Sequence, residues 1–288
     1  MTPEDYCQQK TSQSGSSFYY SFVILPKKQR LAITALYAYC REVDDVVDNI
    51  TEPAIAQAKL DWWREELDRL YQGLPQHPVT QALSHVLNDV DLPKEQLIEI
   101  IDGMAMDLEQ NRYDSFKELS LYCYRVASVV GLLAAQIFGY KDHQTQKYAR
   151  DLGMAFQLTN IIRDVREDAE RNRIYLPQKM LEEFHVSESD ILQLKQTQEL
   201  SLLLAELASQ AKHYYQRAFT HLPKQDRYTQ RAGLMMSAIY QCILNEVEQD
   251  GFRVMQHRIS LPPTRKFWIA SKVLLKEKIR HMFRSNNA

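Results

Sequence analysis

The stretch ALYAYCREVDDVVD, residues 35–48, combines two stripes at helical spacing and indicates the type of fold. Tyr37, Arg41, Asp44 and Asp48 follow one another at intervals of 4, 3 and 4 residues, so they share one face of an α-helix. The neighbouring stripe is apolar and consists of Leu36, Cys40, Val43 and Val47. An acidic stripe beside an apolar one borders a protein core. The stretch therefore predicts a helix that presents oxygen ligands to a partly enclosed site.

The spacing of the two acids on this stripe indicates a cation. Asp44 and Asp48 stand one helical turn apart, and two carboxylates at that distance repel each other unless a cation lies between them. Hard oxygen ligands suit Mg²⁺, which keeps several waters and binds one or two carboxylates together with phosphate oxygens. Arg41 offers a guanidinium group to the same phosphate.

A second stretch, AFQLTNIIRDVREDAERNRIYLP at 155–177, repeats this pattern. Gln157, Asn160, Asp164 and Asp168 are spaced by 3, 4 and 4 residues, and Arg163 flanks them. Their apolar neighbours are Phe156, Leu158, Ile161 and Ile162. One pair of aspartates at this spacing is typical of a solvated helix face. Two such pairs, each beside apolar residues and arginine, predict a paired site for metal ions and diphosphate.

Helical periodicity extends over most of the chain. It predicts helices at 27–49, 54–72, 78–89, 94–112, 117–139, 143–168, 187–221, 225–256 and 263–283. The 8 glycines and 10 prolines fall mainly between these segments, and the alternation typical of strands is absent. We therefore expect one all-α domain over residues 1–288 that ends in a basic helix within 263–284.

Composition limits the classes of function. The 288 residues are 45% hydrophobic and 25% charged, with a net charge of −2, which argues against a surface built to coat nucleic acid. The four cysteines form no CxxC pair, so reduced thiols are expected. The first residues are polar, and the longest nearly apolar run, residues 126–138, is too short to span a bilayer. We expect a cytoplasmic protein.

Four segments resemble the squalene/phytoene synthase family. They are SGSSFYYSF at 14–22, ALYAYCREVDDVVD at 35–48, YCYRVASVVG at 122–131 and the stretch at 155–177. One departure is Ser128, where the family commonly has glycine, and we expect little effect from it. The resemblance implies a prenyltransferase with an isoprenoid-synthase-type helical bundle around a central apolar cavity.

The resemblance also implies a set of metal ligands. Asp44 and Asp48 match the first aspartate-rich motif of the family. Asn160, Asp164 and Asp168 match the second. These five residues are therefore predicted to hold two or three Mg²⁺ ions, and the four aspartates among them are predicted to be catalytic.

Further residues are implied to contact the substrate. Tyr122 matches a tyrosine near the reacting carbons, and its alternative is a hydroxyl hydrogen-bonded in the core. The positions that match diphosphate or substrate contacts are Tyr37, Arg41, Gln157, Arg163 and, on a less specific segment, Tyr240. A flap at the pocket mouth is matched by Ser14, Gly15, Ser16 and Ser17.

The start of the chain, YCQQKTSQSGSSFYYSF, most resembles presqualene diphosphate synthases of bacterial hopanoid pathways. This predicts head-to-head condensation of two farnesyl diphosphates to presqualene diphosphate, with release of diphosphate and no need for NADPH. The alternatives are a phytoene synthase acting on two geranylgeranyl diphosphates, or a complete squalene or dehydrosqualene synthase, because the second motif is shared. Downstream squalene-pathway enzymes would then be partners.

Two other classes of protein fit the sequence less well. A non-catalytic relative that acts as an assembly or binding protein is disfavoured because both aspartate motifs are intact. A di-iron bundle requires two Glu-x-x-His pairs, and the chain has only Glu182 with His185, outside the two stripes.

The expected chemistry needs metal ions at the diphosphate and a dry pocket around the allylic cation. Candidates for the pocket wall, or else for plain core packing, are Phe18, Phe22, Val126, Val129, Val130, Leu132, Leu133 and Leu158. The proton acceptor stays open between Tyr122, another tyrosine and the released pyrophosphate.

The last predicted helix, TRKFWIASKVLLKEKIRHMFRS, has seven Lys or Arg residues against one Glu. It either lies on the anionic inner face of a membrane, as a peripheral contact, or packs on the domain with a solvated basic face.

Overall fold

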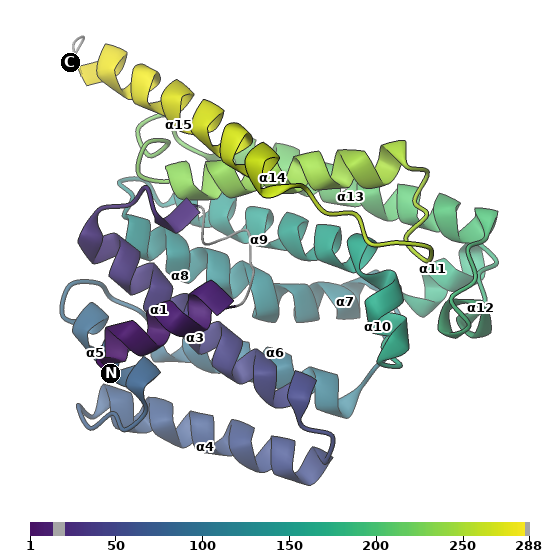
Figure 1. Cartoon of the computed structure of the whole chain (residues 1–288), viewed down its shortest axis with the longest axis horizontal. Helices are drawn as coiled ribbons and strands as arrows, with labels where there is room; N and C mark the ends of the chain where they lie inside the picture. Colours follow the sequence, from purple (N-terminus) through teal and green to yellow (C-terminus); the bar gives the residue numbers. More distant parts are fainter. Residues whose placement is uncertain (14–20, 286–288) are drawn as a thin grey trace.

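The computed structural model describes residues 1–13 and 21–285, and this part of the chain is predominantly helical (Figure 1). The elements are α1 (Pro3–Gln13), α3 (Lys27–Asn49), α4 (Pro53–Tyr71), α5 (Pro78–Leu87), α6 (Lys94–Glu109), α7 (Phe116–Cys123), the π-helical turn η1 (Tyr124–Ser128), α8 (Val129–Phe138), α9 (Gln144–Arg163), α10 (Val165–Glu170), α11 (Gln178–Glu183), α12 (Glu188–Leu192), α13 (Gln198–His221), α14 (Arg231–Gln249) and α15 (Pro263–Ser285). Among the described residues the only β-pairing is an isolated bridge between Arg112 and Ile174. The predicted all-α class is confirmed.

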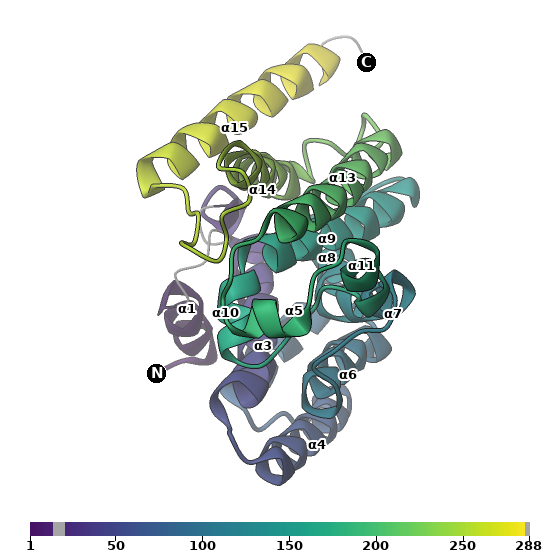
Figure 2. The ribbon, with the colours of Figure 1, turned by 90° about the vertical axis from the view of Figure 1, so that its right-hand side faces the viewer.

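The helices stack in layers that bring distant parts of the chain together. In Figure 1, α4 forms one edge, α3 and α6 the next layer, η1 and α8 the middle, and α9, α13 and α14 the layers beyond. Figure 2 shows α15 as the outermost helix on the opposite edge, lying across α14. The helices with the two aspartate motifs, α3 and α9, therefore lie on opposite sides of α8.

Two hydrophobic cores hold this arrangement. One contains fully buried residues of α3, α4 and α6 such as Leu36, Leu60 and Ile100. The other joins α9, α13 and α14 through residues such as Leu204 and Ile239. Because the cores lie on either side of the middle layer, the space between them is framed by rigid helices.

The backbones of η1 and α8 lie in direct contact with the backbone of α9. A Cβ atom added to Gly153 would lie 2.6 Å from the Ala127 carbonyl oxygen and 2.6 Å from the Ser128 Cα atom. A Cβ atom on Gly131 would lie 2.6 Å from the Ala149 carbonyl oxygen. Ser128 is fully buried, and its hydroxyl donates to the Arg150 carbonyl oxygen at 2.8 Å, so the serine is satisfied there. Only residues without a side chain permit this contact.

Several predicted helix boundaries are wrong. The helix predicted at 143–168 breaks at Asp164 (φ −104°, ψ 15°) into α9 and α10. The one predicted at 187–221 is interrupted after α12, where Leu194 takes a positive φ of 56°. The helix predicted at 225–256 begins at Arg231 and ends at Gln249, just before Gly251 at φ 73°. Helical periodicity continues through these turns, but local backbone geometry ends each helix.

Helix α1 was missed because its sequence, PEDYCQQKTSQ, is almost entirely polar. Only Cys7 and Thr11 are buried, yet the helix packs against α3 and α5. Tertiary contacts stabilise a helix that its own apolar pattern does not announce.

One continuous helical stretch among the described residues, Phe116–Phe138, is long and apolar enough to cross a membrane by length and composition alone. It comprises α7, η1 and α8, and 44% of its most apolar window is buried. It contacts α3, α6 and α9 in the middle of the bundle. We assign it to the protein core.

Candidate active site

A polar chamber of about 520 Å³ opens between α3, α6, α9 and α14. It is lined by every described residue that the sequence predicts for the site, namely Tyr37, Arg41, Asp44, Asp48, Tyr122, Gln157, Asn160, Arg163, Asp164, Asp168 and Tyr240. The predicted flap residues Ser14, Gly15, Ser16 and Ser17 and the wall candidate Phe18 lie outside the described residues. The structure thus gathers both aspartate motifs around one space. The roles of the individual residues stay predictions.

The first motif is held by arginines. On α3, the Arg41 guanidinium binds the Asp44 carboxylate and also donates to Asp45 Oδ1 at 2.8 Å. Asp48, one turn further, accepts from Arg173 at 2.9 Å and from Arg171 at 3.1 Å. The two arginines follow α10, so this pairing joins the two motifs across the chamber.

The second motif keeps its stripe despite the helix break. The Asp164 amide donates to the Asn160 carbonyl oxygen at 2.8 Å, and the Asp168 amide donates to the Asp164 carbonyl oxygen at 2.9 Å. These bonds keep the four-residue steps of a helix on either side of the break. The Asp164 carboxylate accepts from Arg163 Nε at 2.7 Å and from Arg258 Nε at 2.8 Å.

Asn160 has an unsatisfied oxygen at the chamber. Its amide nitrogen donates to Gln157 Oε1 at 3.3 Å, while its Oδ1 atom is buried without a hydrogen-bond partner. A buried acceptor left unpaired costs free energy unless a ligand satisfies it. This atom fits an oxygen ligand of a hard cation.

The chamber also holds carboxylates whose charge is poorly stabilised. Burial, followed by repulsion from Asp164, raises the pKa of Asp168 to about 8. Burial also raises the pKa of Asp44 and that of Asp107 to about 6. Asp164 differs: burial opposes ionisation, but Arg163 and Arg258 outweigh it and lower the pKa. Divalent cations would stabilise the charged forms of the first three groups.

These oxygen ligands fit metal ions that also bind the substrate. Five carboxylates face six cationic side chains in the chamber, the latter being Arg41, Arg163, Arg171, Arg173, Arg258 and Lys266. Within the described residues, no group of three or more His, Cys, Asp or Glu side chains is close enough to hold an ion by itself. Side-chain oxygens here would share each ion with water and phosphate oxygens, as is usual for Mg²⁺.

A buried network beside the motifs was not predicted from the sequence. Asp107 of α6 accepts from the Tyr122 hydroxyl at 3.0 Å and from the Tyr175 hydroxyl at 2.8 Å. The two tyrosine rings stack at 5.0 Å between centroids. Asn172 adopts φ 58° after α10, and this turn brings Arg173 and Tyr175 back to the chamber. The available signal for Asp107 was a single acid within the apolar run GMAMDL at 103–108.

Arg258 and Lys266 also line the chamber and were missed. They come from the connection before α15 and from its first turn, far from both motifs in sequence. No spacing rule links them to the stripes.

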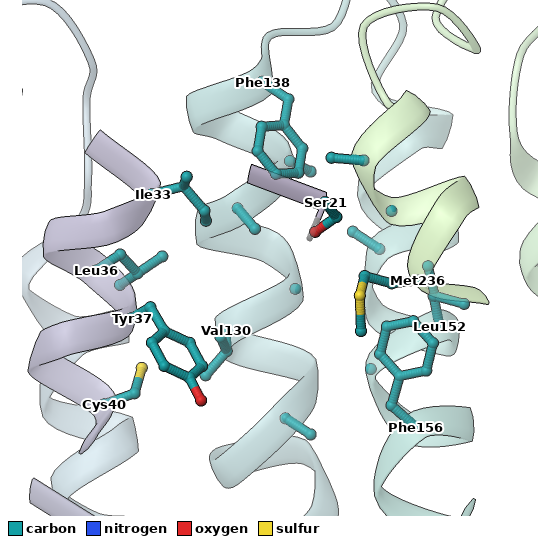
Figure 3. Close-up of a pocket in the computed structure, with 18 of the residues that line it drawn as sticks. Ser21, Ile33, Leu36, Tyr37, Cys40, Val130, Phe138, Leu152, Phe156 and Met236 are labelled. Atoms are coloured by element: carbon teal, nitrogen blue, oxygen red, sulfur yellow. The ribbon is translucent and has the colours of Figure 1, made fainter. Parts of the chain in front are cut away.

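An apolar cavity of about 200 Å³ continues from the polar chamber (Figure 3). Figure 3 shows Leu36 of α3, Val130 of α8, Phe156 of α9 and Met236 of α14 around it. The two spaces share five lining residues, which are Tyr37, Cys40, Val126, Gln157 and Asn160. The predicted central apolar cavity is therefore present, and it meets the polar chamber directly.

The predicted apolar wall is partly right. Phe22, Val126 and Val130 line the cavity. The other described candidates, Val129, Leu132, Leu133 and Leu158, do not line it. Val129, Leu133 and Leu158 are 0% exposed and pack within the two cores. Helix orientation turns these side chains away from the cavity, and sequence alone did not fix that orientation.

Comparison with known proteins places the chain in a family. A model of the squalene/phytoene synthase family matches residues 11–265. The 15-cis-phytoene synthase of Synechocystis sp. is 34% identical over 94% of this chain and 86% of its own length. Phytoene synthase of Arthrospira platensis is 34% identical over 91% of this chain and 89% of its own length.

Solved structures agree on the fold. The crystal structure of a dehydrosqualene synthase in complex with ligand superposes with a TM-score of 0.84 at 28% identity, covering 96% of each chain. The squalene synthase HpnC from Alicyclobacillus acidocaldarius gives a TM-score of 0.79 at 26% identity, over 87% of this chain and 94% of that one.

These relatives correct the predicted reaction. Presqualene diphosphate formation was inferred from the N-terminal segment, but the similar curated proteins, 32–34% identical, are phytoene synthases. That inference was wrong because the motifs that bind diphosphate are common to both reactions. A short segment at the start of the polypeptide does not report the length of the prenyl substrate. The family match over residues 11–265, together with the shared fold, shows that the chain belongs to the squalene/phytoene synthase family of prenyltransferases, which use divalent metal for diphosphate substrates.

Proposed function

We propose that the protein joins two geranylgeranyl diphosphates head to head to form phytoene, with release of two diphosphates. The observation that carries this proposal is a polar chamber with both aspartate motifs that opens into an apolar cavity through five shared residues. The choice of the C20 substrate is supported by the names of the phytoene synthases to which the chain is similar over most of its length.

In this proposal the diphosphates lie in the chamber. Asp44, Asp48, Asn160, Asp164 and Asp168 would hold Mg²⁺, which neutralises the charge that grows on the leaving diphosphate. The five arginines of the chamber then exchange part of their pairing with carboxylates for pairing with phosphate oxygens. Arginine suits this exchange because its planar fork binds carboxylate and phosphate equally well.

The apolar cavity takes the prenyl chains and keeps water from the allylic cation. The junction of the two spaces, at Tyr37 and Gln157, is where the reacting carbon would lie. Carbon–oxygen bonds to both diphosphates break, and two protons leave as one carbon–carbon bond and one additional double bond form. The overall balance needs no reductant, so NADPH is not part of the proposal.

In this proposal Tyr122 handles a proton near the reacting carbons. Its hydroxyl lies at the chamber wall and donates to Asp107, whose pKa burial raises to about 6. A carboxylate with such a pKa accepts and returns a proton near neutral pH. Burial raises the pKa of Tyr122 itself far above its usual value, so the tyrosine stays protonated unless Asp107 takes part.

The test incubates the purified chain with Mg²⁺ and either geranylgeranyl or farnesyl diphosphate, without NADPH, and identifies products by mass. The expected result is a C40 hydrocarbon and two diphosphates per product. Asp44→Asn and Asp164→Asn should each lower kcat by ~10²-fold or more, since each removes charge stabilisation of the leaving group. Asp89→Asn, an exposed carboxylate paired with Lys28, is the matched control and should be neutral.

Two results would contradict the proposal. A C30 product formed from farnesyl diphosphate with a higher kcat/KM would show that the C20 assignment is wrong. Normal diphosphate release by both Asp44→Asn and Asp164→Asn would remove the paired-metal site.

A further inference from the structure

Helix α15 has an inner face that fastens it to the protein. Ala270 and Glu277 are buried at 4% and 2% exposure, and Val273 packs against the core of α9, α13 and α14. The Glu277 carboxylate accepts from Arg227 at 2.8 Å and from Arg280 at 2.8 Å. These contacts account for the attachment of α15 to the bundle. They use only one side of the helix.

The outer face of α15 is apolar and uncovered. Its large side chains are between 39% and 68% exposed and comprise Phe267, Trp268, Leu275, Ile279, Met282 and Phe283. Sixteen large hydrophobic side chains are exposed among the described residues, so this single helix holds six of them. At ~100° per residue the six span an arc of about 160° on one side of the helix. An apolar face of this extent on a polar background marks a contact surface.

Basic side chains lie among and beside these apolar ones, because at ~100° per residue Lys272 and Lys278 fall within the same arc and Lys276 falls at its edge. Lys272, Lys276 and Lys278 are exposed, and the Lys272 ammonium lies 5.1 Å from the centroid of the Trp268 ring. The helix has a single acid, Glu277, and that residue points into the protein. The rest of the chain compensates, because the total net charge is −2. Positive charge is therefore concentrated around the exposed apolar stripe.

A second cavity extends this basic edge. It has a volume of about 730 Å³ and lies between the C-terminal half of α15 and the segments around Lys141 and Lys224. Arg227 and Arg280 also line it, together with the outer-face residues Ile279 and Phe283. Cations and apolar side chains thus meet at one opening on the same edge of the molecule. This arrangement complements a lipid, whose anionic headgroup lies next to its apolar acyl chains.

We propose that the outer face of α15 binds the surface of an anionic lipid bilayer. The six apolar side chains enter the boundary between headgroups and acyl chains, and the lysines contact the phosphates. A second copy of this chain fits less well, because it would bring a like-charged face against this one. Such docking goes beyond the proposed reaction and would place a hydrocarbon-producing enzyme on the phase that dissolves its product.

The test measures flotation of the whole chain with vesicles. The protein should bind vesicles of phosphatidylcholine with 30% phosphatidylglycerol, bind phosphatidylcholine alone at least tenfold more weakly, and lose the difference in 0.5 M salt. The variant Lys272→Gln/Lys276→Gln/Lys278→Gln should bind anionic vesicles at least tenfold more weakly, since each lysine near such a surface contributes about a fivefold factor.

A second variant removes the apolar contacts. Phe267→Ser/Leu275→Ser/Met282→Ser should bind at least tenfold more weakly and keep its melting temperature and its Mg²⁺-dependent activity in detergent. The matched control places three serines at exposed apolar positions elsewhere, as Ile55→Ser/Leu74→Ser/Leu202→Ser, and should bind like the unmodified protein.

Tryptophan quenching by brominated lipid tests docking of α15 in the unmodified protein. The variant Trp268→Phe gives the background from Trp62 and Trp63. Quenching of Trp268 on anionic vesicles supports docking. The proposal is overturned if the unmodified protein binds neither vesicle, if it binds both equally, or if the three-serine α15 variant binds as well as its control. It is also overturned if sedimentation shows a dimer that this variant abolishes while vesicle binding is absent.

Discussion

Asp107 connects several side chains of the candidate active site. Its two carboxylate oxygens accept from different tyrosines, Oδ2 from Tyr122 and Oδ1 from Tyr175. Burial raises its pKa to about 6, and Arg173 opposes that rise. The residue therefore holds the Tyr122 hydroxyl in place and stays close to the protonation change that a proton carrier needs.

Replacing Asp107 by Asn should lower kcat about tenfold to a hundredfold and change KM less than about threefold. The two tyrosines donate to different oxygens of Asp107, and Asn replaces one of these acceptors by a donating NH2 group that cannot take a proton. Steady-state kinetics and the pH dependence of kcat are the measurements. Asp102→Asn on the same helix removes a half-buried partner of Arg64 and serves as control. An unchanged kcat in Asp107→Asn would leave the network a purely structural one.

At the scale of elements, the distance between the two aspartate motifs depends on small residues. Gly131 lets α8 and Gly153 lets η1 touch α9 through the backbone, and both glycines line the apolar cavity that meets the chamber. The π-helical turn η1 lies at the same place, between the catalytic candidate Tyr122 and Gly131. Such turns are frequent at functional sites because they re-aim nearby side chains.

Gly153→Ala should destabilise the fold by about 1–3 kcal/mol and lower activity as well, because the new methyl group forces α9 away from η1. Urea unfolding gives the free energy, and diphosphate release gives the activity. The control Ala205→Ser adds one atom at an exposed position of α13 and should leave both unchanged. Full stability in Gly153→Ala would mean that the helices are not fixed by this contact.

At the scale of the molecule, two hydrophobic cores frame the polar chamber and the apolar cavity, so the site exists without its ligands. Without ligands, the negative charge of its buried carboxylates costs free energy. The raised pKa values of Asp44 and Asp168, about 6 and about 8, mean that the folded chain binds protons there which the unfolded chain has released. This contribution to stability is fully present below the unfolded pKa of about 3.8 and is lost as the pH rises from there, up to about 6 for Asp44 and up to about 8 for Asp168.

Mg²⁺ together with inorganic pyrophosphate should raise the melting temperature by several degrees, since a ligand at 100 times its Kd stabilises by about 2.7 kcal/mol. Each component alone should have a smaller effect, because each leaves like charges unpaired. Binding should tighten from pH 6 to pH 8, as Asp44 and Asp168 release protons. Thermal unfolding across pH, with and without EDTA, is the measurement. If pyrophosphate in the presence of EDTA shifts the melting temperature as much as pyrophosphate with Mg²⁺ does, metal-dependent binding is contradicted.

The sequence alone determined the helical class and the stripes of the site. Periodicity in α3 placed Tyr37, Arg41, Asp44 and Asp48 on one face, and this follows from helix geometry without any tertiary contact. The second stripe also survived, because backbone bonds of helical spacing span the break at Asp164. Local rules are sufficient wherever a property depends on neighbours within one or two turns.

Only the tertiary structure decided how these pieces meet. Asp107, Tyr175, Arg258 and Lys266 reach the chamber from separate elements, and their convergence depends on packing between residues far apart in the chain. Packing also set which apolar side chains face the cavity and which, like Leu158, face a core. Helix α1 likewise depends on contacts with α3 and α5 that no local pattern records. Long-range packing fixes the orientation of each helix, and orientation decides which side chains form the site.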